Sequence, residues 1–142
     1  MDFVWLNGDD SRVQDALALR MEVFVAEQGF SAESEKDALD VRAQHIVGYD
    51  NGKALCCARL FPEQNNEWHV GRIVVKKILR GKGIGKRMLD EVAKKAKQQG
   101  GRSVILGAQY DKEPFYAACG YEKFGEPFLD ENYPHVWMRK IL

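Results

Sequence analysis

The chain reads Ile73-Val74-Val75-Lys76-Lys77-Ile78-Leu79-Arg80-Gly81-Lys82-Gly83-Ile84-Gly85-Lys86 in the stretch that decides its fold. β-Branched residues end a predicted strand, a basic glycine-rich turn follows, and a helical pattern begins at Ile84. This order directs several unpaired backbone N–H groups and the positive end of a helix dipole toward one point. Because glycines let an anion approach the backbone closely, the stretch predicts a phosphate-binding turn.

The turn departs from two common nucleotide-binding motifs. In a Walker loop ending at Gly85-Lys86, Arg80 would replace the first glycine and Arg87 would replace the Ser or Thr. The Gly-x-Gly-x-x-Gly fingerprint fails as well, because Lys86 or Met88 occupies the position of its third glycine. These departures disfavour an ordinary nucleotide ligand. A basic turn without any ligand stays open on this pattern alone.

Helical patterns precede and follow the turn. Ser11 and Gln14 resemble a capping box, and the helix that they begin should run to Gln28 and end at Gly29. A second helix should begin at Ile84 and end at Gly100-Gly101, and a short third one should cover residues 114–119. The apolar faces of the two longer helices are expected to be Val13, Ala16, Leu17, Met21 and Phe24 in the first, and Met88, Leu89, Val92, Ala93 and Ala96 in the second.

Apolar runs rich in β-branched and aromatic residues predict strands at 3–6, 45–49, 54–61, 68–75, 103–108, 121–124 and 136–139. Asn51-Gly52 predicts a tight hairpin turn between the second and third of them. The strand at 103–108 should run parallel to the strand at 68–75, because a helix connects them. Residues 31–40 predict a loop or a short helix. The expected fold class is α/β, with a mixed, mostly antiparallel central sheet flanked by helices.

Composition indicates one folded domain over residues 1–142. Hydrophobic residues make up 45% of the chain and charged residues 30%, and no linker or repeat divides it. The formal net charge of zero disfavours general nucleic-acid binding, which needs a basic excess.

The cysteines point to a reducing environment. Cys56, Cys57 and Cys119 are odd in number and form no Cys-x-x-Cys pair, so neither a disulfide framework nor a metal site is expected. The N-terminus has no signal-peptide pattern, and no apolar run reaches transmembrane length. We therefore expect a cytoplasmic protein without a membrane partner.

The turn and several further segments together resemble one known family. Arg80-Gly81-Lys82-Gly83-Ile84-Gly85 is similar to the Arg/Gln-x-x-Gly-x-Gly/Ala signature of the GNAT superfamily of acyl-CoA N-acyltransferases. The run from Phe115 to Tyr121 resembles the family's Phe-Tyr-x-x-x-Gly-Phe/Tyr segment. Residues 19–28, Ala108-Gln109 and 128–135 resemble the ElaA-like and YjcF-like subgroup. Lys77 is a departure, since many members have proline there.

The resemblance implies a cofactor and the residues that hold it. The glycine-rich loop would bind the pyrophosphate of acetyl-CoA, the acyl donor, while an amine-bearing acceptor would be the second substrate. A bulge would free backbone N–H groups before the loop, and one of them would bond the thioester oxygen. Gln109 would contact the pantetheine arm. The expected cofactor-binding residues are Ile73, Val74, Val75, Arg80, Gly81, Lys82, Gly83, Ile84, Gly85, Lys86, Gln109 and Tyr116.

The same resemblance implies direct transfer to a primary amine, without an acyl-enzyme, so Cys119 is expected to be a core residue. Tyr116 is the candidate general acid, because a phenol keeps its proton at neutral pH and can give it to a thiolate. Glu27 and His45 are the candidate general bases. A lone histidine in a strand is more often structural, and a carboxylate near a helix end is more often solvated.

Two other functional classes remain beside the enzyme. A non-catalytic acyl-CoA sensor would keep the same loop and fold, and a domain for ordinary nucleotides would bind a phosphate ligand of another kind. The sequence leaves open the acceptor, the acyl chain length and the oligomeric state, a homodimer included.

Overall fold

The computed structural model describes residues 1–32 and 37–142. Its strands are β1 (Asp2–Asn7), β2 (Gln44–Asp50), β3 (Lys53–Pro62), β4 (Glu67–Val75), β5 (Ser103–Gln109), β6 (Glu122–Asp130) and β7 (Tyr133–Ile141). Its helices are α1 (Val13–Arg20), the π-helix η1 (Met21–Glu27), α3 (Leu39–Arg42), α4 (Ile84–Gln98) and α5 (Glu113–Ala118), with short 3₁₀ helices η2 (Lys77–Leu79) and η3 (Tyr110–Lys112). The expected loop or short helix at 31–40 lies partly outside the described residues.

The described strands form one seven-stranded sheet in the order β1-β2-β3-β4-β5-β7-β6. Every neighbouring pair is antiparallel except β4 and β5, which are parallel because α4 connects them. The predicted α/β class with a mixed, mostly antiparallel sheet is confirmed. The predicted hairpin turn is also found, with φ angles of 51° at Asn51 and 75° at Gly52.

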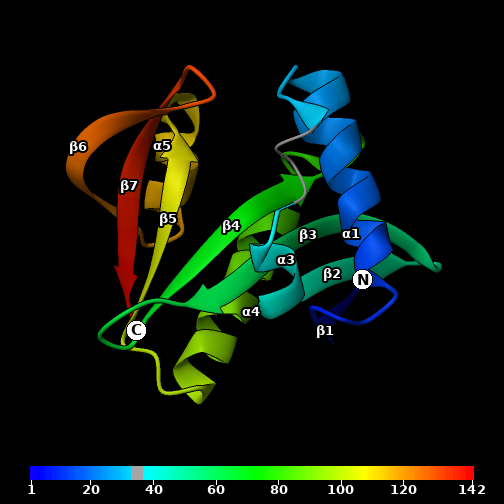
Figure 1. Cartoon of the computed structure of the whole chain (residues 1–142), viewed down its shortest axis with the longest axis horizontal. Helices are drawn as coiled ribbons and strands as arrows, with labels where there is room; N and C mark the ends of the chain where they lie inside the picture. The colour runs from blue at the N-terminus through cyan, green and yellow to red at the C-terminus, as the bar shows by residue number, and fades with distance from the viewer. Residues whose placement is uncertain (33–36) are drawn as a thin grey trace.

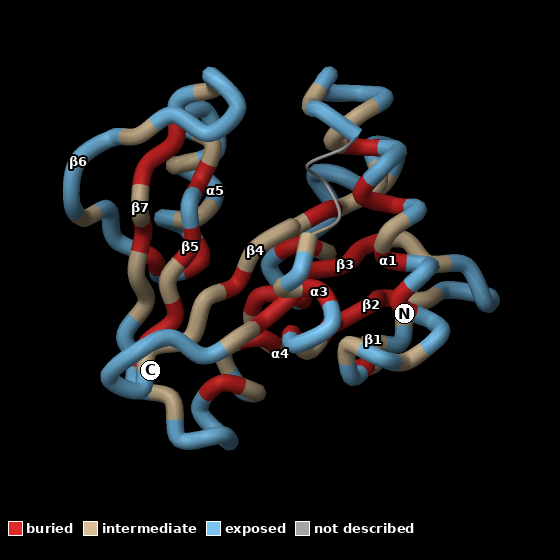
Figure 2. The backbone as a smooth tube through the Cα atoms, in the orientation of Figure 1, coloured by how far each residue is buried: buried red, intermediate tan, exposed pale blue. Residues whose placement is uncertain are grey.

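Helices cover both faces of the sheet (Figure 1). α1 and η1 pack Val13, Ala16, Leu19 and Val23 against one face, where Val47, Cys57 and Val74 lie. α4 packs against the opposite face and buries the side chains that periodicity predicted, except that Ala93 is half-buried. Figure 2 shows the buried backbone concentrated in the central strands and in the helix turns that face them.

β4 and β5 are paired only at one end. Their register joins residues 67–69 of β4 to residues 103–105 of β5, and beyond it the two strands diverge (Figure 1). β4 stays paired with β3 on its other side through a bulge, because Cys57 pairs with Val74 while Arg59 pairs with Gly71. The β5-facing edge of β4 beyond His69 therefore has no strand partner among the described residues.

The start of the first helix differs from its prediction. The N-cap is Arg12, and its side chain makes no capping bond, so the expected capping box of Ser11 and Gln14 is wrong. The Asp10 carboxylate instead accepts a bond of 2.9 Å from the Arg12 backbone N–H. Asp10 thus satisfies a backbone donor at the helix start, as Ser11 was predicted to do.

The buried face of the first helix differs too. The backbone widens into the π-helix η1 at Met21, but the buried residues Val13, Ala16, Leu19, Arg20 and Val23 keep α-helical spacing, on a stripe rotated from the predicted one. Met21 is 41% exposed, although the spacing predicted it to be buried, and Leu19 and Val23 are buried in its place. The predicted end at Gly29 is confirmed by its φ of 78°.

The C-terminal hairpin is longer than predicted. β6 and β7 extend well beyond 121–124 and 136–139, because the ladder continues past a bulge between Phe124 and Phe128. That bulge contains Gly125 and Pro127, residue types that ordinarily end a strand. The hairpin turn uses Glu131 and Asn132 with φ angles of 49° and 63°, without a glycine.

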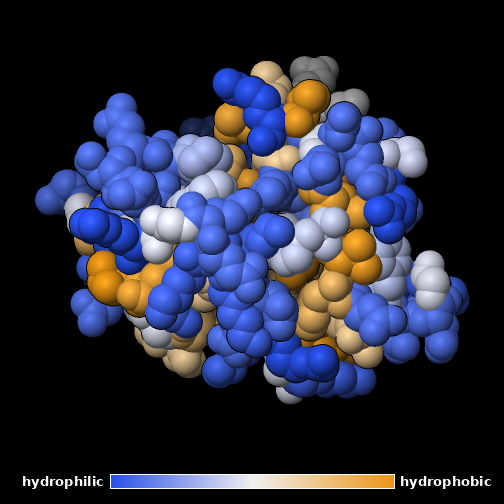
Figure 3. Space-filling view, turned by 90° about the horizontal axis from the view of Figure 1, so that it is seen from below, coloured by the Kyte–Doolittle hydropathy of each residue, from blue (hydrophilic) through white to orange (hydrophobic). Residues whose placement is uncertain are grey.

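The surface seen from below is mainly hydrophilic, with hydrophobic side chains in scattered patches (Figure 3). Within the described residues, no helix is long and apolar enough to cross a membrane. The same residues hold no group of three or more His, Cys, Asp or Glu side chains arranged for a metal ion. Cys56, Cys57 and Cys119 are buried free thiols.

Candidate functional site

The glycine-rich turn joins the diverging end of β4 to the start of α4. Gly81 and Gly83 have φ angles of 81° and 80°, in the left-handed region that favours glycine. Gly83 is the N-cap of α4, and no side chain of the described residues caps this helix start. Since the first N–H groups of a helix lack intrahelical acceptors, those of α4 can bind an anion.

Gly85 is needed for a different reason, because the start of α4 is closely packed. A Cβ at this position would lie 3.0 Å from Cζ of Phe115 and 3.5 Å from Cγ2 of Val75. Glycine therefore allows α4 to approach both α5 and the end of β4. The contact places the Phe115-Tyr116 segment beside the turn.

Exposed lysines surround the turn with positive charge. Lys82 and Lys86 are both exposed, and the Lys86 ammonium lies 3.5 Å from Asp90 on the next turn of α4. A surface ion pair of this kind contributes little to stability. Both ammonium groups can therefore turn toward a bound anion at small cost.

Ile73, Val74 and Val75 combine buried or partly buried side chains with an open backbone edge. Ile73 and Val75 pack against the core on the α4 side, while Val74 is buried on the α1 side. One edge of their backbone pairs with β3, and the other faces the divergence from β5. These residues can thus fill the core and still offer backbone groups to a ligand.

Arg80 and Glu27 form a bidentate ion pair across the turn. Arg80 Nη1 and Nη2 donate to Glu27 Oε2 and Oε1 at 2.6 and 2.9 Å, and Arg80 Nε donates to the Val75 carbonyl at 3.0 Å. An expected cofactor residue and an expected base are thereby brought together. The hydrogen bond from Arg80 lowers the pKa of Glu27, so this carboxylate is a weaker proton acceptor while the pair is intact.

Tyr116 lies in α5, half-buried against the core on the α4 side. Its ring centroid lies 5.0 Å from that of Phe115 and 6.3 Å from that of Tyr121. Burial raises the pKa of Tyr116 above its usual value, so the phenol keeps its proton at neutral pH. Cys119 is 6% exposed and burial raises its pKa, which agrees with its expected place in the core.

Gln109 ends β5 and donates a hydrogen bond of 2.9 Å from Nε2 to Oε1 of Gln28. Both amides line a cavity of about 350 Å³ between the end of η1, the end of β5 and the β6–β7 turn, together with Gly29, Phe30, Asp111, Lys112, Glu131, Asn132 and Tyr133. A second cavity, of about 530 Å³, lies at the paired end of β4, where Trp68 lines it. We assign no ligand to the second cavity, because it lies at the end of β4 away from the turn.

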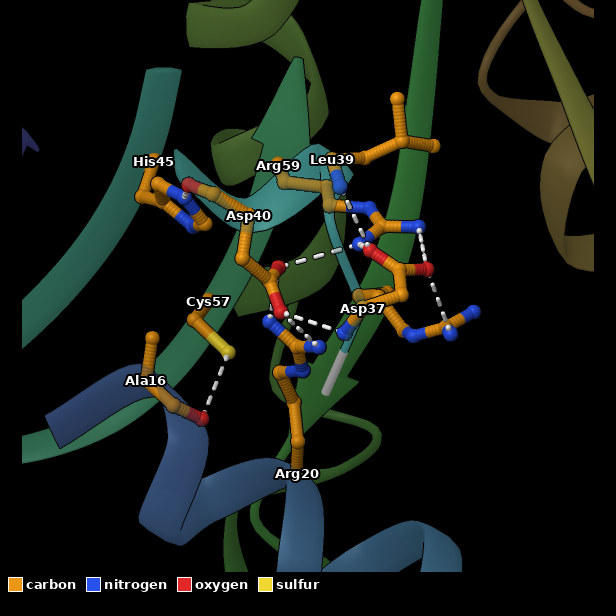
Figure 4. A network of polar contacts seen from close by, with 9 residues as sticks. Ala16, Arg20, Asp37, Leu39, Asp40, His45, Cys57 and Arg59 are labelled. Atoms are coloured by element: carbon orange, nitrogen blue, oxygen red, sulfur yellow. Dashed lines mark hydrogen bonds and ion pairs between the residues drawn. The ribbon is translucent and has the colours of Figure 1, made fainter. Parts of the chain in front are cut away.

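His45 lies two strands away from β4, beside a buried ion-pair network (Figure 4). Its side chain is 1% exposed, and Nε2 lies 2.8 Å from the backbone carbonyl of Asp40. Burial lowers the pKa of His45, so the ring stays neutral. The structure brings Glu27 to the turn but places His45 with this network instead.

The network itself was not predicted from the sequence. Arg20 and Arg59 share the carboxylate of Asp40, and Arg59 also binds Asp37. Burial raises the pKa of Asp40, but hydrogen bonds from Arg20 and Arg59 outweigh it and lower the pKa to about 2. One signal was present, because Arg20 stands four residues after Ala16 and three before Val23, on the buried stripe of its helix.

Comparison with known proteins identifies the family. The sequence matches the Acetyltransferase (GNAT) domain over residues 10–142. It is 36% identical over 133 residues to YjcF of Bacillus subtilis, which is named as an uncharacterized N-acetyltransferase, with 93% of this chain and 94% of YjcF covered. The crystal structure of Escherichia coli ElaA superposes with a TM-score of 0.88 at 25% identity, covering 99% of each chain.

The chain belongs to the GNAT acetyltransferase family. Its homologues include YjcF and ElaA, which confirms the subgroup expected from the sequence. An aminoglycoside 6'-N-acetyltransferase complexed with coenzyme A has the same fold, with a TM-score of 0.78 at 18% identity over 99% of this chain and 97% of the other.

Proposed function

We propose that this protein is an acyl-CoA-dependent N-acetyltransferase that moves an acetyl or other short acyl group to a primary amine. The proposal is carried by the start of α4, which follows a positive-φ glycine turn at the diverging ends of β4 and β5. A pyrophosphate would meet several N–H donors and a helix dipole there. Membership of the GNAT family, and the coenzyme A bound by an enzyme of the same fold, support acetyl-CoA as the donor.

Within this proposal the turn and the open strand edge hold different parts of the cofactor. Residues 80–86 would bind the pyrophosphate, with Lys82 and Lys86 balancing its charge. The pantetheine arm would run between the diverging strands past Gln109. A backbone N–H within residues 73–75 would bond the thioester oxygen, where one preorganised donor contributes about 10²–10³ in rate.

The proposed reaction is a direct displacement. The unprotonated amine attacks the thioester carbon, its nitrogen then loses a proton to Glu27 or to water, and the C–S bond breaks. The departing thiolate takes a proton from Tyr116, which regains one from solvent. Tyr116→Phe should lower the maximal rate by about 10²- to 10⁴-fold with little change in KM for acetyl-CoA. An unchanged maximal rate across pH would remove Tyr116 from this role.

Glu27 is the candidate base that lies at the turn, and its pair with Arg80 would have to open before it accepts a proton. The acceptor would approach through the cavity that Gln28, Phe30 and Gln109 line. Two carboxylates of that cavity, Asp111 and Glu131, suit a positively charged amine. We propose the cytoplasm as the location, where buried thiols such as Cys56 stay reduced.

Thermal unfolding with acetyl-CoA, dephospho-CoA, ATP or buffer alone tests the cofactor site. A ligand that binds only the native state raises the Tm once its concentration exceeds Kd. We expect a rise with the two coenzyme A compounds, and its loss in a Gly83→Glu, Gly85→Glu variant. Gly52→Glu is the matched control for the single change Gly83→Glu, because both glycines have a positive φ and open space around them, whereas Gly85 packs against Phe115. No rise at millimolar acetyl-CoA would contradict the proposal.

A non-catalytic acyl-CoA sensor is the second candidate. It is favoured because neither candidate base is free to accept a proton from an amine: Glu27 is paired with Arg80, and His45 is buried. Release of free thiol from acetyl-CoA, measured across a panel of amines, separates the two functions. Amine-dependent release supports the enzyme, whereas binding with only slow thioester hydrolysis supports the sensor.

A further inference from the structure

The bulge in β4 contains a residue in an unusual backbone conformation. Arg72 has a φ of 49°, although it is not a glycine and lies within a strand. It follows Gly71, where the register with β3 shifts, and it precedes Ile73, the first residue of the proposed acyl site. Since side chains disfavour this region, surrounding contacts must hold Arg72 there.

An ion-pair chain leads from Arg72 into the interior. Nη2 of Arg72 lies 3.3 Å from Oδ2 of Asp37, and Asp37 receives bonds of 2.6 and 3.0 Å from Arg59. Arg59 continues to Asp40 at 3.0 Å, and Asp40 is held by Arg20 at 2.8 and 3.1 Å. Figure 4 shows these side chains converging from α1, from β3 and from the segment around Asp37.

The two ends of this chain differ in burial. The side chains of Arg20 and Asp40 are 1% and 3% exposed, whereas those of Asp37 and Arg72 are 35% and 25% exposed. The buried end is fixed by short bonds and by the close packing of α1 on the sheet. Through Asp37, the side chain of Arg72 therefore ties the backbone of the bulge to this rigid buried cluster.

We propose that Asp37 and Arg72 are positioning residues for the acyl group. Their ion pair holds β4 in the bulge, and the bulge sets the direction of the backbone N–H groups of residues 73–75 toward the thioester oxygen. This inference rests on the proposed function. It predicts that the pair acts on the acyl carbonyl and leaves the pyrophosphate site, which begins at Arg80, unchanged.

The test compares ligands that differ only in the acyl group. Dissociation constants for acetyl-CoA and for free CoA are measured by calorimetry in the wild type and in the Asp37→Asn, Arg72→Gly and Arg72→Lys variants. The infrared C=O stretch of bound acetyl-CoA, isotope-labelled at the thioester carbonyl, reports the hydrogen bond directly. Arg12→Ala is the control, because it breaks an exposed ion pair with Asp10 outside the site.

We expect Asp37→Asn and Arg72→Gly to weaken acetyl-CoA binding by about 3- to 10-fold, as loss of one hydrogen bond does, while CoA binding stays within about 2-fold. The bound C=O band should move to higher frequency, because a carbonyl that loses a hydrogen bond is less polarised. Arg72→Lys keeps a cation and should retain part of the effect. Arg72→Gly is informative because glycine accepts the positive φ but cannot bind Asp37.

Three results would overturn the inference. One is an unchanged band and affinity in Arg72→Gly, since backbone conformation alone would then set the bulge. Another is an equal loss of acetyl-CoA and CoA affinity, which indicates general destabilisation. A wild type that binds neither ligand would overturn the proposed function as well, whereas normal wild-type binding with unaffected variants would overturn this inference alone.

Discussion

Two of the bidentate arginine–carboxylate pairs in the molecule lie in opposite surroundings. The pair of Arg20 and Asp40 has side chains that are 1% and 3% exposed, whereas in the pair of Arg80 and Glu27 they are 35% and 30% exposed. The buried pair cannot open without leaving a charge in the interior. The exposed pair can exchange its partner for a ligand at small cost. The same type of ion pair thus holds the fold rigidly at Arg20 and Asp40, and forms an exchangeable contact at Arg80 and Glu27.

Removing the charge from the buried pair should have the largest effect. Asp40→Asn leaves Arg20 and Arg59 buried without their shared carboxylate, and we expect a loss of about 3–5 kcal/mol in the free energy of unfolding. Urea unfolding measures it. Asp10→Asn, in an exposed pair with Arg12, is the control and should change the same free energy far less. A comparably small effect of Asp40→Asn would contradict the anchor role.

Acid should weaken the buried pair by a smaller amount. The folded pKa of Asp40 is about 2, below the ordinary value of 3.8, so the unfolded chain binds more protons between these values. The contribution of Asp40 to the free energy of unfolding is therefore present above about pH 4, and about 2 kcal/mol of it is lost as the pH falls toward 2. Unfolding free energies across this range check the slope, which Asp40→Asn should reduce more than Glu27→Gln does, because the pKa of Glu27 is lowered as well. If Asp40→Asn had the same slope as the wild type, Asp40 would not be the source of this pH dependence.

The exposed pair should show the smallest effect on stability and a separate effect on binding. Glu27→Gln is expected to change the unfolding free energy by less than about 1 kcal/mol. It frees Arg80 from a competing carboxylate, so Kd for acetyl-CoA should fall by a few-fold. Calorimetric titration measures this, with Glu22→Gln on the same helix as a control. Weaker binding in Glu27→Gln would show that Glu27 orients Arg80 and does not compete for it.

The same contrast explains how far the sequence could predict the molecule. Local patterns located the strands and the buried face of α4, because both depend on the spacing of apolar residues. They also located the turn, because the positive φ angles there favour glycine at 81 and 83. The Glu27–Arg80 pair joins residues 53 positions apart, and no local pattern reports such a contact. The network around Asp40 also depends on tertiary packing. His45 illustrates this, since its alternation in a strand was visible but its burial beside Asp40 was not.

Errors in the elements have local physical causes. The predicted stripe passed through Met21 because it followed apolar residues alone, whereas the buried stripe passes through Arg20, whose charge is paired with Asp40. The extent of β6 was underestimated because Gly125 and Pro127 resemble a strand end, yet the ladder passes them in a bulge. A periodic pattern of apolar residues represents neither a buried charged side chain nor a bulge in a strand.

We propose that coenzyme A binds at the start of α4 and along the open edge of β4. Backbone amide chemical shifts, followed while CoA is titrated into the protein, test it residue by residue. We predict the largest changes at residues 81–86, with further changes at 73–75 and at Gln109. Changes confined to other surfaces, such as the cavity around Trp68, would contradict the claim.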